Sequence, residues 1–369
     1  MADRRRVLQV GAAGLGALAV APVLEAGTAY ADPGHKPGGQ RSLVIGHRGA
    51  AGYRPEHTLA SYELGARMGA DFIEPDLVST KDGVLVARHE PEIGGTTDVA
   101  GRPEFAGRKR TMVLDGVSVT GWWTHDFTLA ELKTLRAVER LPAVRQRNTM
   151  YDGYFQVPTF QEVLDLRARL SKELGRTIGV YPETKHPTYF RNLGLALEPK
   201  LVEALRHNGL DHPDAPVFVQ SFEAHNLASL RHDFKLRVPQ VFLTSASGNP
   251  FADPRSYAEY LTPAGLKELA GYVDGVGPDK VQIIPRNPDN TLGTPTSLVA
   301  DAHHAGLVLH PYTFRAENQF LPADYQVTTD PNAYGRAIAE QVTFLHAGID
   351  GLFTDQADIG VLARSLAFA

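Results

Sequence analysis

The sequence predicts an α/β fold, a TIM (β/α)8 barrel with a small insertion after the third strand. Short apolar runs of strand length recur from residue 43 onward, and most are followed by a stretch with helical periodicity. Polar residues stand at the carboxyl ends of these runs, where parallel α/β folds bind their ligands. Eight parallel strands close into such a barrel, and they are expected to begin near Leu43, Phe72, Val84, Thr177, Val217, Val238, Leu307 and Leu352.

The first 31 residues have the pattern of an export signal. Three consecutive arginines precede an apolar run rich in Ala and Gly, and Ala29-Tyr30-Ala31 offers a cleavage site. Arg4 and Arg5 are typical of the twin-arginine type, so we expect export by the twin-arginine (Tat) machinery and a secreted, extracytoplasmic protein. A retained membrane anchor is the weaker alternative, because glycines and a proline interrupt a run that barely reaches spanning length.

The remainder divides into a leader, a barrel and an insertion. Residues 32–42 are rich in Gly and Pro and predict a flexible leader. The barrel is expected over residues 43–365, with the insertion at residues 91–157. We expect the insertion to shape the site and to meet the leaving part of the substrate. Trp122 and Trp123 within it are expected to pack in a small core.

Composition excludes several classes of site and partner. The chain has no Cys among its 369 residues, which removes disulfides, thiolate zinc sites and thiol nucleophiles. Its formal charge of −5 argues against nucleic acid as a general ligand but leaves room for a small anionic substrate held by local Arg and Lys. After residue 31 the sequence has no apolar segment of membrane-spanning length, so we expect no stable membrane insertion once the signal is cleaved.

Two acidic residues point to a metal site. Glu74 and Asp76 are two positions apart on a predicted strand, so both carboxylates should project from the same face. Apolar neighbours mark that strand as buried, and two buried anions need a cation to neutralise them. An all-oxygen ligand set suits calcium or magnesium rather than zinc. The alternative is a solvated sheet edge without a metal.

Two histidines end the flanking predicted strands. His47, followed by Arg48, ends the first strand, and His89 ends the third. A single histidine is most often a surface residue or a hydrogen-bonded core residue. Two imidazoles beside a metal, however, fit general acid and general base work on a phosphate or acyl group, because histidine titrates near neutral pH.

Five short motifs occur in order along this region: HRG at 47–49, PEHT at 55–58, E-x-D at 74–76, TKDG at 80–83 and the histidine at 89. Together they resemble the motifs of the glycerophosphodiester phosphodiesterases, especially the exported bacterial branch, in which PEHT replaces the PENT seen elsewhere. Many members have His-Asp where this chain has His89-Glu90. That departure retains the catalytic histidine and concerns only the local turn.

The resemblance implies metal-dependent hydrolysis of glycerophosphodiesters, such as glycerophosphocholine and glycerophosphoethanolamine, to sn-glycerol 3-phosphate and an alcohol. In the mechanism proposed for the family, the substrate's own neighbouring hydroxyl attacks to give a cyclic phosphate, which water then opens. The ion is expected to be Ca2+, with Mg2+ as the alternative. Glu56 would either join the metal ligands or orient Arg48.

The resemblance also assigns roles to individual residues. The expected site comprises catalytic His47, His89 and Arg48, metal ligands Glu74, Asp76 and Glu183, a phosphate-facing Lys185, and Phe222 and Tyr312 packed on the glycerol carbons. The alternative for Glu183 and Lys185 is that they only pair with each other.

Other functions remain open at this level. Glycerol-phosphate wall polymers such as teichoic acid contain the same bond, so an exolytic hydrolase of such polymers would have the same site. A glycosidase could use the three carboxylates as its acid and nucleophile on the same barrel. A non-catalytic surface binding protein could use the barrel as a scaffold.

Overall fold

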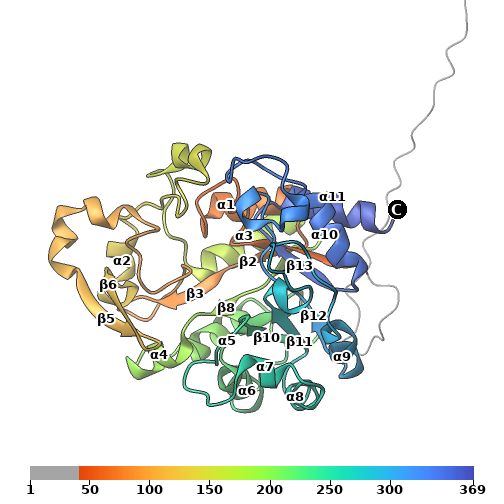
Figure 1. Cartoon of the computed structure of the whole chain (residues 1–369). Helices are drawn as coiled ribbons and strands as arrows, with labels where there is room; N and C mark the ends of the chain where they lie inside the picture. The colour runs from red at the N-terminus through yellow and green to blue at the C-terminus, as the bar shows by residue number, and fades with distance from the viewer. Residues whose placement is uncertain (1–40) are drawn as a thin grey trace, which may run out of the picture.

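The computed structural model describes residues 41–369, so the predicted signal and nearly all of the predicted leader lie outside the described residues. Parallel strands form a ring at the centre of the molecule, with helices around it (Figure 1). In chain order the ring contains β1 (Leu43–His47), β2 (Phe72–Glu74) continued by β3 (Asp76–Ser79), β7 (Gly179–Val180) continued by β8 (Glu183–Thr184), β9 (Val219–Ser221), β10 (Gln240–Thr244), β11 (Gly275–Pro278), β12 (Val308–Leu309) and β13 (Gly351–Thr354).

Prolines divide the ring into two sheets. Pro75 separates β2 from β3 and Pro182 separates β7 from β8, because proline has no N–H to donate to a strand ladder. One sheet has the order β13-β1-β2-β7, and the other runs from β12 through β11, β10, β9 and β8 to β3. Where the ring closes, no continuous ladder joins β12 to β13, but the Asp350 amide donates to the Leu309 carbonyl at 2.9 Å. The fold is therefore the predicted α/β barrel.

One predicted barrel strand was wrong. The apolar run at Val84 forms β4 (Leu85–Ala87), which pairs antiparallel with β3. The TKDG motif is the turn of this hairpin: the Val84 amide donates to Thr80 Oγ1 at 2.9 Å, and Gly83 has a φ of 77°. The predicted insertion therefore follows a β-hairpin and not a third barrel strand.

The barrel strand that the sequence did not predict is β11. Its residues Gly275 to Pro278 include two glycines and a proline, which have low strand propensity. A Cβ at Gly275 would come within 2.9 Å of the Val308 carbonyl oxygen, so the close approach of β12 requires glycine there, whereas a Cβ at Gly277 would come within 2.5 Å of a Leu243 methyl group, which would have to move. The apolar run at residues 281–284, which follows β11, contains buried Ile283 and Ile284 and forms no barrel strand.

Helices cover the outside of the ring. Threonine side chains cap two of them: Thr58 accepts from the Ser61 amide before α1 (Leu59–Arg67), and Thr159 accepts from the Glu162 amide before α3 (Phe160–Glu173). The others are α4 (Pro187–Asn192), α5 (Glu198–His207), α6 (Ala224–His232), α7 (Tyr257–Tyr260), α8 (Pro263–Leu269), α9 (Leu298–His304), α10 (Ala337–His346) and α11 (Ala357–Ala367). Among the described residues, no helix combines the length and the apolar character needed to cross a membrane.

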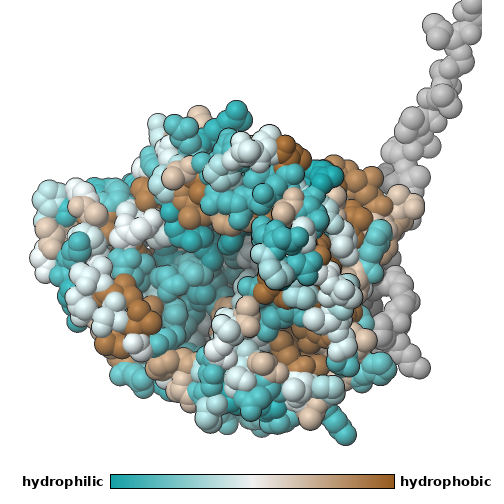
Figure 2. Space-filling view, viewed as in Figure 1, coloured by the Kyte–Doolittle hydropathy of each residue, from teal (hydrophilic) through white to brown (hydrophobic). Residues whose placement is uncertain are grey.

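Residues 91–157 extend from one side of the barrel and contain a β-hairpin, formed by β5 (Arg110–Leu114) and β6 (Val117–Gly121), and the short helix α2 (Leu129–Leu132) (Figure 1). Trp122 and Trp123 are buried as expected, but they belong to the same apolar cluster as the barrel core and do not form a small core of their own. Figure 2 shows a hollow with a largely hydrophilic lining between this extension and the barrel.

Candidate active site

All nine predicted site residues line one cavity of about 130 Å³ at the carboxyl ends of the barrel strands. The structure therefore brings together side chains that are spread over residues 47 to 312, while the roles assigned to them stay predictions. The cavity is lined by His47, Arg48, Glu74, Asp76, His89, Glu183, Lys185, Phe222 and Tyr312, together with Gln220, Leu243, Thr313, Arg315 and Phe353.

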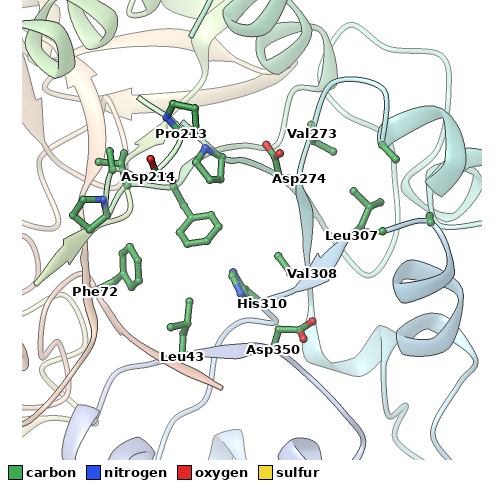
Figure 3. Close-up of a pocket in the computed structure, with 18 of the residues that line it drawn as sticks. Leu43, Phe72, Pro213, Asp214, Val273, Asp274, Leu307, Val308, His310 and Asp350 are labelled. Atoms are coloured by element: carbon green, nitrogen blue, oxygen red, sulfur yellow. The ribbon is translucent and has the colours of Figure 1, made fainter. Parts of the chain in front are cut away.

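A larger cavity of about 290 Å³ lies at the opposite end of the barrel, among Leu43, Phe72, Val308 and His310 (Figure 3). Some of its polar groups have partners within the protein: His310 Nδ1 lies 2.8 Å from the Tyr181 hydroxyl, and Asp274 accepts from Arg231 at 2.6 Å. Among the described residues, the three carboxylates close enough to share a metal ion line the smaller cavity and not this one. Since parallel barrels bind their ligands at the carboxyl ends, we place the active site in the smaller cavity.

Three carboxylates form the centre of this site. Glu74 is the last residue of β2, Asp76 is the first of β3, and Asp76 stands opposite Glu183 in the parallel pairing of β3 with β8. One oxygen of each lies within 4.8 Å of the others, and the residues are only 1%, 1% and 5% exposed. This burial rules out the solvated sheet edge. Burial and repulsion from Asp76 raise the pKa of Glu74 well above its usual value, and burial likewise raises the pKa of Glu183 to about 8.

Each carboxylate is oriented by a neighbour. Glu74 accepts from the Arg48 amide at 2.7 Å and from Gln220 Nε2 at 3.2 Å. Asp76 lies 2.8 Å from His57 Nε2, and Glu183 lies 3.1 Å from Lys185 Nζ. Three converging, buried carboxylates without nitrogen or sulfur ligands fit a hard divalent cation such as Ca2+ or Mg2+.

Arg48 brings a fixed positive charge to the cluster. Its Nη1 donates to Glu56 Oε2 at 2.9 Å, and its Nε lies 3.5 Å from Asp76 Oδ2. Glu56 also accepts from Arg140 at 2.7 Å and is not among the three clustered carboxylates. Of the two possibilities left open for Glu56, the geometry therefore supports the orientation of Arg48.

His47 is held by a buried carboxylate. Its Nδ1 lies 2.5 Å from Asp355 Oδ1, and an ionised carboxylate can only accept, so Nδ1 carries the proton. Asp355 Oδ2 in turn accepts from Arg145 at 2.5 Å and from Arg315 at 2.9 Å. Burial, together with the charge of Arg48, lowers the pKa of His47 to about 4. The neutral imidazole thus keeps Nε2 free to take a proton.

His89 has a similar partner from its own neighbour in the chain. Its Nδ1 lies 2.9 Å from Glu90 Oε1. Burial and the positive charges of Arg48 and Lys185 lower the pKa of His89 to about 3. Both imidazoles are therefore neutral at neutral pH, with Nδ1 occupied by a carboxylate in each case.

Two aromatic rings form one wall of the cavity. The rings of Phe222 and Tyr312 meet edge to face with their centroids 5.8 Å apart, and Lys185 Nζ lies 5.4 Å from the Phe222 centroid. They offer an apolar surface beside the charged groups, as the glycerol carbons of the expected substrate require.

Sequence reasoning missed four residues of this site: His57, Asp355, Arg145 and Arg315. His57 belongs to the PEHT motif and Asp355 follows the last strand, so the rule that polar residues at strand ends build sites could have identified Asp355. Arg145 lies in the predicted insertion and its sequence neighbourhood gives no such signal.

Comparison with known proteins agrees with this geometry. The chain is 40% identical over 329 residues to the glycerophosphodiester phosphodiesterase GDPD6 of Arabidopsis thaliana, covering 85% of this chain and 84% of that protein. It is 31% identical over 326 residues to a glycerophosphodiester phosphodiesterase of Bacillus subtilis, covering 86% and 85%.

Among solved structures, a phosphodiesterase of Oleispira antarctica in complex with the product sn-glycerol-3-phosphate matches with a TM-score of 0.56 at 18% identity, covering 88% of this chain and 97% of that chain. At this identity the match shows the shared fold. The model of the family described as the glycerophosphoryl diester phosphodiesterase family matches residues 47–359. That match spans most of the chain and includes every residue of the cavity, so the protein belongs to the glycerophosphoryl diester phosphodiesterase family.

Proposed function

We propose that this chain hydrolyses glycerophosphodiesters, such as glycerophosphocholine and glycerophosphoethanolamine, to sn-glycerol 3-phosphate and an alcohol. The observation that carries the proposal is the convergence, in one cavity, of three buried carboxylates, two carboxylate-bound imidazoles and two cationic side chains. The names of the curated relatives support it, as does the product in the Oleispira antarctica structure.

The chemistry of a phosphodiester explains why these groups are needed together. The substrate is an anion, so a catalyst must neutralise its oxygens, remove a proton from the attacking hydroxyl and give one to the leaving alkoxide. Arg48 and Lys185 supply fixed positive charge beside the phosphate. A divalent cation held by Glu74, Asp76 and Glu183 would supply further positive charge there, and we propose Ca2+ as the preferred ion.

His47 and His89 would divide the two proton transfers. Both are neutral in the free site, and a bound phosphate anion would favour a proton on the nearer imidazole. One imidazole would accept the proton of the glycerol hydroxyl next to the phosphate as that oxygen attacks phosphorus and the alcohol leaves. The other would protonate the leaving oxygen. Water then opens the cyclic phosphate, with the two roles exchanged.

A substrate panel tests the proposal. Release of glycerol 3-phosphate should be measured from glycerophosphocholine, from a glycerol-phosphate wall polymer and from a lysolipid, each with calcium and with excess chelator. We expect calcium-dependent release, largest for the small diester. Release mainly from the polymer would favour the exolytic hydrolase of teichoic acid, and metal-independent sugar release from glycosides would favour the glycosidase.

The attacking hydroxyl has its own test. A glycerophosphocholine analogue without the hydroxyl next to the phosphate should be nearly inert, because the attacking oxygen is lost. Comparable rates on glycerophosphocholine and on this analogue would show that water attacks phosphorus directly.

We also propose that the protein is exported by the twin-arginine route and acts outside the cytoplasm. Support comes from the paired Arg4 and Arg5, the apolar run and the Ala29-Tyr30-Ala31 site, all of which precede the family match at residue 47. Cell fractionation of the full chain and of a double variant, Arg4→Lys with Arg5→Lys, tests this. Retention of the double variant in the cytoplasm is expected, and equal export of the two would contradict the twin-arginine route.

A further inference from the structure

Glu90 binds two imidazoles at once. Its Oε1 lies 2.9 Å from Nδ1 of His89, and its Oε2 lies 2.9 Å from Nε2 of His186. The other ring nitrogen of His186, Nδ1, lies 2.6 Å from Asp115 Oδ2. His186 and Asp115 are outside the cavity of the active site, so this chain of contacts reaches a catalytic histidine from the protein around it.

The contacts determine the charge of His186. Ionised carboxylates accept hydrogen bonds and cannot donate them, so both ring nitrogens of His186 must donate. An imidazole with two N–H groups is a cation. Although burial opposes it, hydrogen bonding to Asp115 and Glu90 raises the pKa of His186 to about 9, and the neighbouring charge of Lys185 is too small an effect to reverse this.

The backbone positions His186 between two parts of the molecule. It follows β8 at three residues beyond Glu183, has a φ of 48°, and stands immediately before α4, which begins at Pro187. Asp115 lies in the turn between β5 and β6, where its φ is 47° and that of Gly116 is 85°. His186 therefore connects the tip of the hairpin in the insertion to the strand that carries a predicted metal ligand and the phosphate-facing lysine.

We propose that His186 is a positioning residue for the reaction: it holds Glu90 so that Glu90 fixes the ring and the tautomer of His89, and Asp115 of the hairpin holds His186 in turn. Binding at Nδ1 by Glu90 leaves Nε2 of His89 without a proton and available to the substrate. This role rests on the proposed hydrolysis of glycerophosphodiesters. The tautomer of His89 can nevertheless be measured in the absence of substrate.

The other catalytic histidine supports this assignment. His47 has the same sequence of contacts, from Nδ1 to a carboxylate, Asp355, and from that carboxylate to a cation, Arg145. In enzymes, the partner that holds the second nitrogen of an active histidine fixes its tautomer and orientation. These contacts explain why a glutamate is useful at position 90: one of its oxygens contacts His89 and the other contacts His186.

The central variant is His186→Asn, which removes the cation. We expect kcat to fall roughly tenfold to a hundredfold with KM changed less than about twofold, the range found when an orienting partner is removed. The limb of the pH profile that belongs to His89 should move to lower pH, because the hydrogen bond to Glu90 raises the pKa of His89 and becomes less populated. Other charged groups near His186 are Glu90, Asp115 and Lys185. Glu223 and His186 also line a separate cavity beside the active site.

A matched control is available at the other end of the barrel. His303 Nε2 lies 2.9 Å from Asp350 Oδ2, with 23% of its side chain exposed against 19% for His186. His303→Asn breaks the same kind of pair far from the site, so it should leave kcat and the pH profile unchanged. If His186→Asn behaves like His303→Asn, with at most a lower Tm, His186 is only structural and the proposal is wrong.

A double variant tests whether the contacts act in series. Glu90→Gln combined with His186→Asn should cost no more in kcat than the worse single variant, because both break one chain of contacts. Multiplied losses would overturn the proposal. If His186→Asn does not fold, Asp115→Asn, made from the hairpin side, should give a smaller loss of kcat and the same shift of the pH profile; no change in either would also count against it.

A measurement without substrate separates this proposal from the proposed function. Nitrogen-15 NMR of histidine-labelled protein, with the His89 signals assigned by their absence in His89→Gln, reports which ring nitrogen carries the proton. We expect the Nδ1–H tautomer in the unsubstituted protein and a mixture in His186→Asn. An unchanged tautomer would overturn the proposal even if the enzyme hydrolyses glycerophosphodiesters, whereas inactivity of the unsubstituted protein would affect only the proposed function.

Discussion

The two histidines proposed to be catalytic are held by equivalent contacts, but the contacting residues differ in type and in burial. On one side Asp355, with 2% of its side chain exposed, is held by Arg145 and Arg315. On the other, Glu90, with 39% exposed, is held by His186. Arginine keeps its charge at every pH at which proteins fold, but histidine does not. The comparison teaches that the contacts around His47 keep their charges as the pH changes, whereas the orientation of His89, on our proposal, depends on the protonation of His186.

The largest expected effect acts on the carboxylates between the two histidines. If Glu74, Asp76 and Glu183 hold a divalent cation, excess chelator should abolish turnover, and calcium or magnesium should restore it, because the phosphate charge is no longer neutralised. Turnover measured before chelation, after it and after each ion gives the answer. Full activity in excess chelator would show that the two histidines work without a metal.

Next in size is the loss of either imidazole. His47→Ala and His89→Ala should each lower kcat by about 10² to 10⁴, the range typical of general acid or base catalysis. Thermal melting should change little for His89→Ala, whose side chain is 25% exposed. If only one of the two variants loses activity on this scale, the sides are not chemically equivalent. A variant that unfolds while its folded fraction turns over normally would identify that histidine as a core residue.

The difference in burial predicts a difference in stability. Asp355→Asn leaves Arg145 and Arg315 facing a neutral group in a buried position, and should cost about 3–5 kcal/mol in the free energy of unfolding. Glu90→Gln is more exposed and should cost under about 1 kcal/mol. Urea unfolding of the two variants compares them directly. Equal losses in unfolding free energy would show that the partly exposed contacts of Glu90 stabilise the fold as much as the buried contacts of Asp355.

The smallest effect is a pH dependence on one side only. The pKa of His186 is raised from 6.5 to about 9, so its stabilisation is fully present below pH 6.5 and is lost as the pH rises through 9. The difference in unfolding free energy between the unsubstituted protein and His186→Asn should therefore be largest near pH 6, at under about 1 kcal/mol because Glu90 and Asp115 are partly exposed to solvent, and should fall as the pH rises through 9. A difference that stays constant from pH 6 to 10 would show that His186 is not charged in the folded protein.

The site residues that could be predicted are those whose neighbouring sequence marks them. His47, Arg48, Glu74, Asp76 and Lys185 each follow or lie within an apolar run of the barrel, and the rule for strand ends was sufficient to bring them together. His89 reaches the site for another reason: the antiparallel hairpin of β3 and β4 returns the chain, and the Arg88 amide donates to the Asp76 carbonyl at 3.0 Å. Asp355 and Arg145 pair with partners 308 and 210 positions away, and neither spacing nor periodicity encodes such contacts.

The strands of the fold also differ in whether their local sequence predicts them. Strands with apolar, β-branched residues were predicted at the right places, whereas β11 was missed because its two glycines and its proline have low strand propensity. The direction of β4 was wrong because a turn of four residues returned the chain on itself, and an apolar run alone does not reveal whether the next strand is parallel.

Arg145 has a consequence for how substrate reaches the site. It projects from the insertion into the barrel, is 4% exposed, and donates to Asp355 at 2.5 Å, to Glu317 at 2.7 Å and to the Ala51 carbonyl at 3.0 Å. If the insertion swung away as a lid, these buried charges would separate, at a cost of about 3–5 kcal/mol. Fewer than about one molecule in a hundred would then be open at any moment. The hollow between the insertion and the barrel is therefore the route that stays open to substrate and product while the two remain joined.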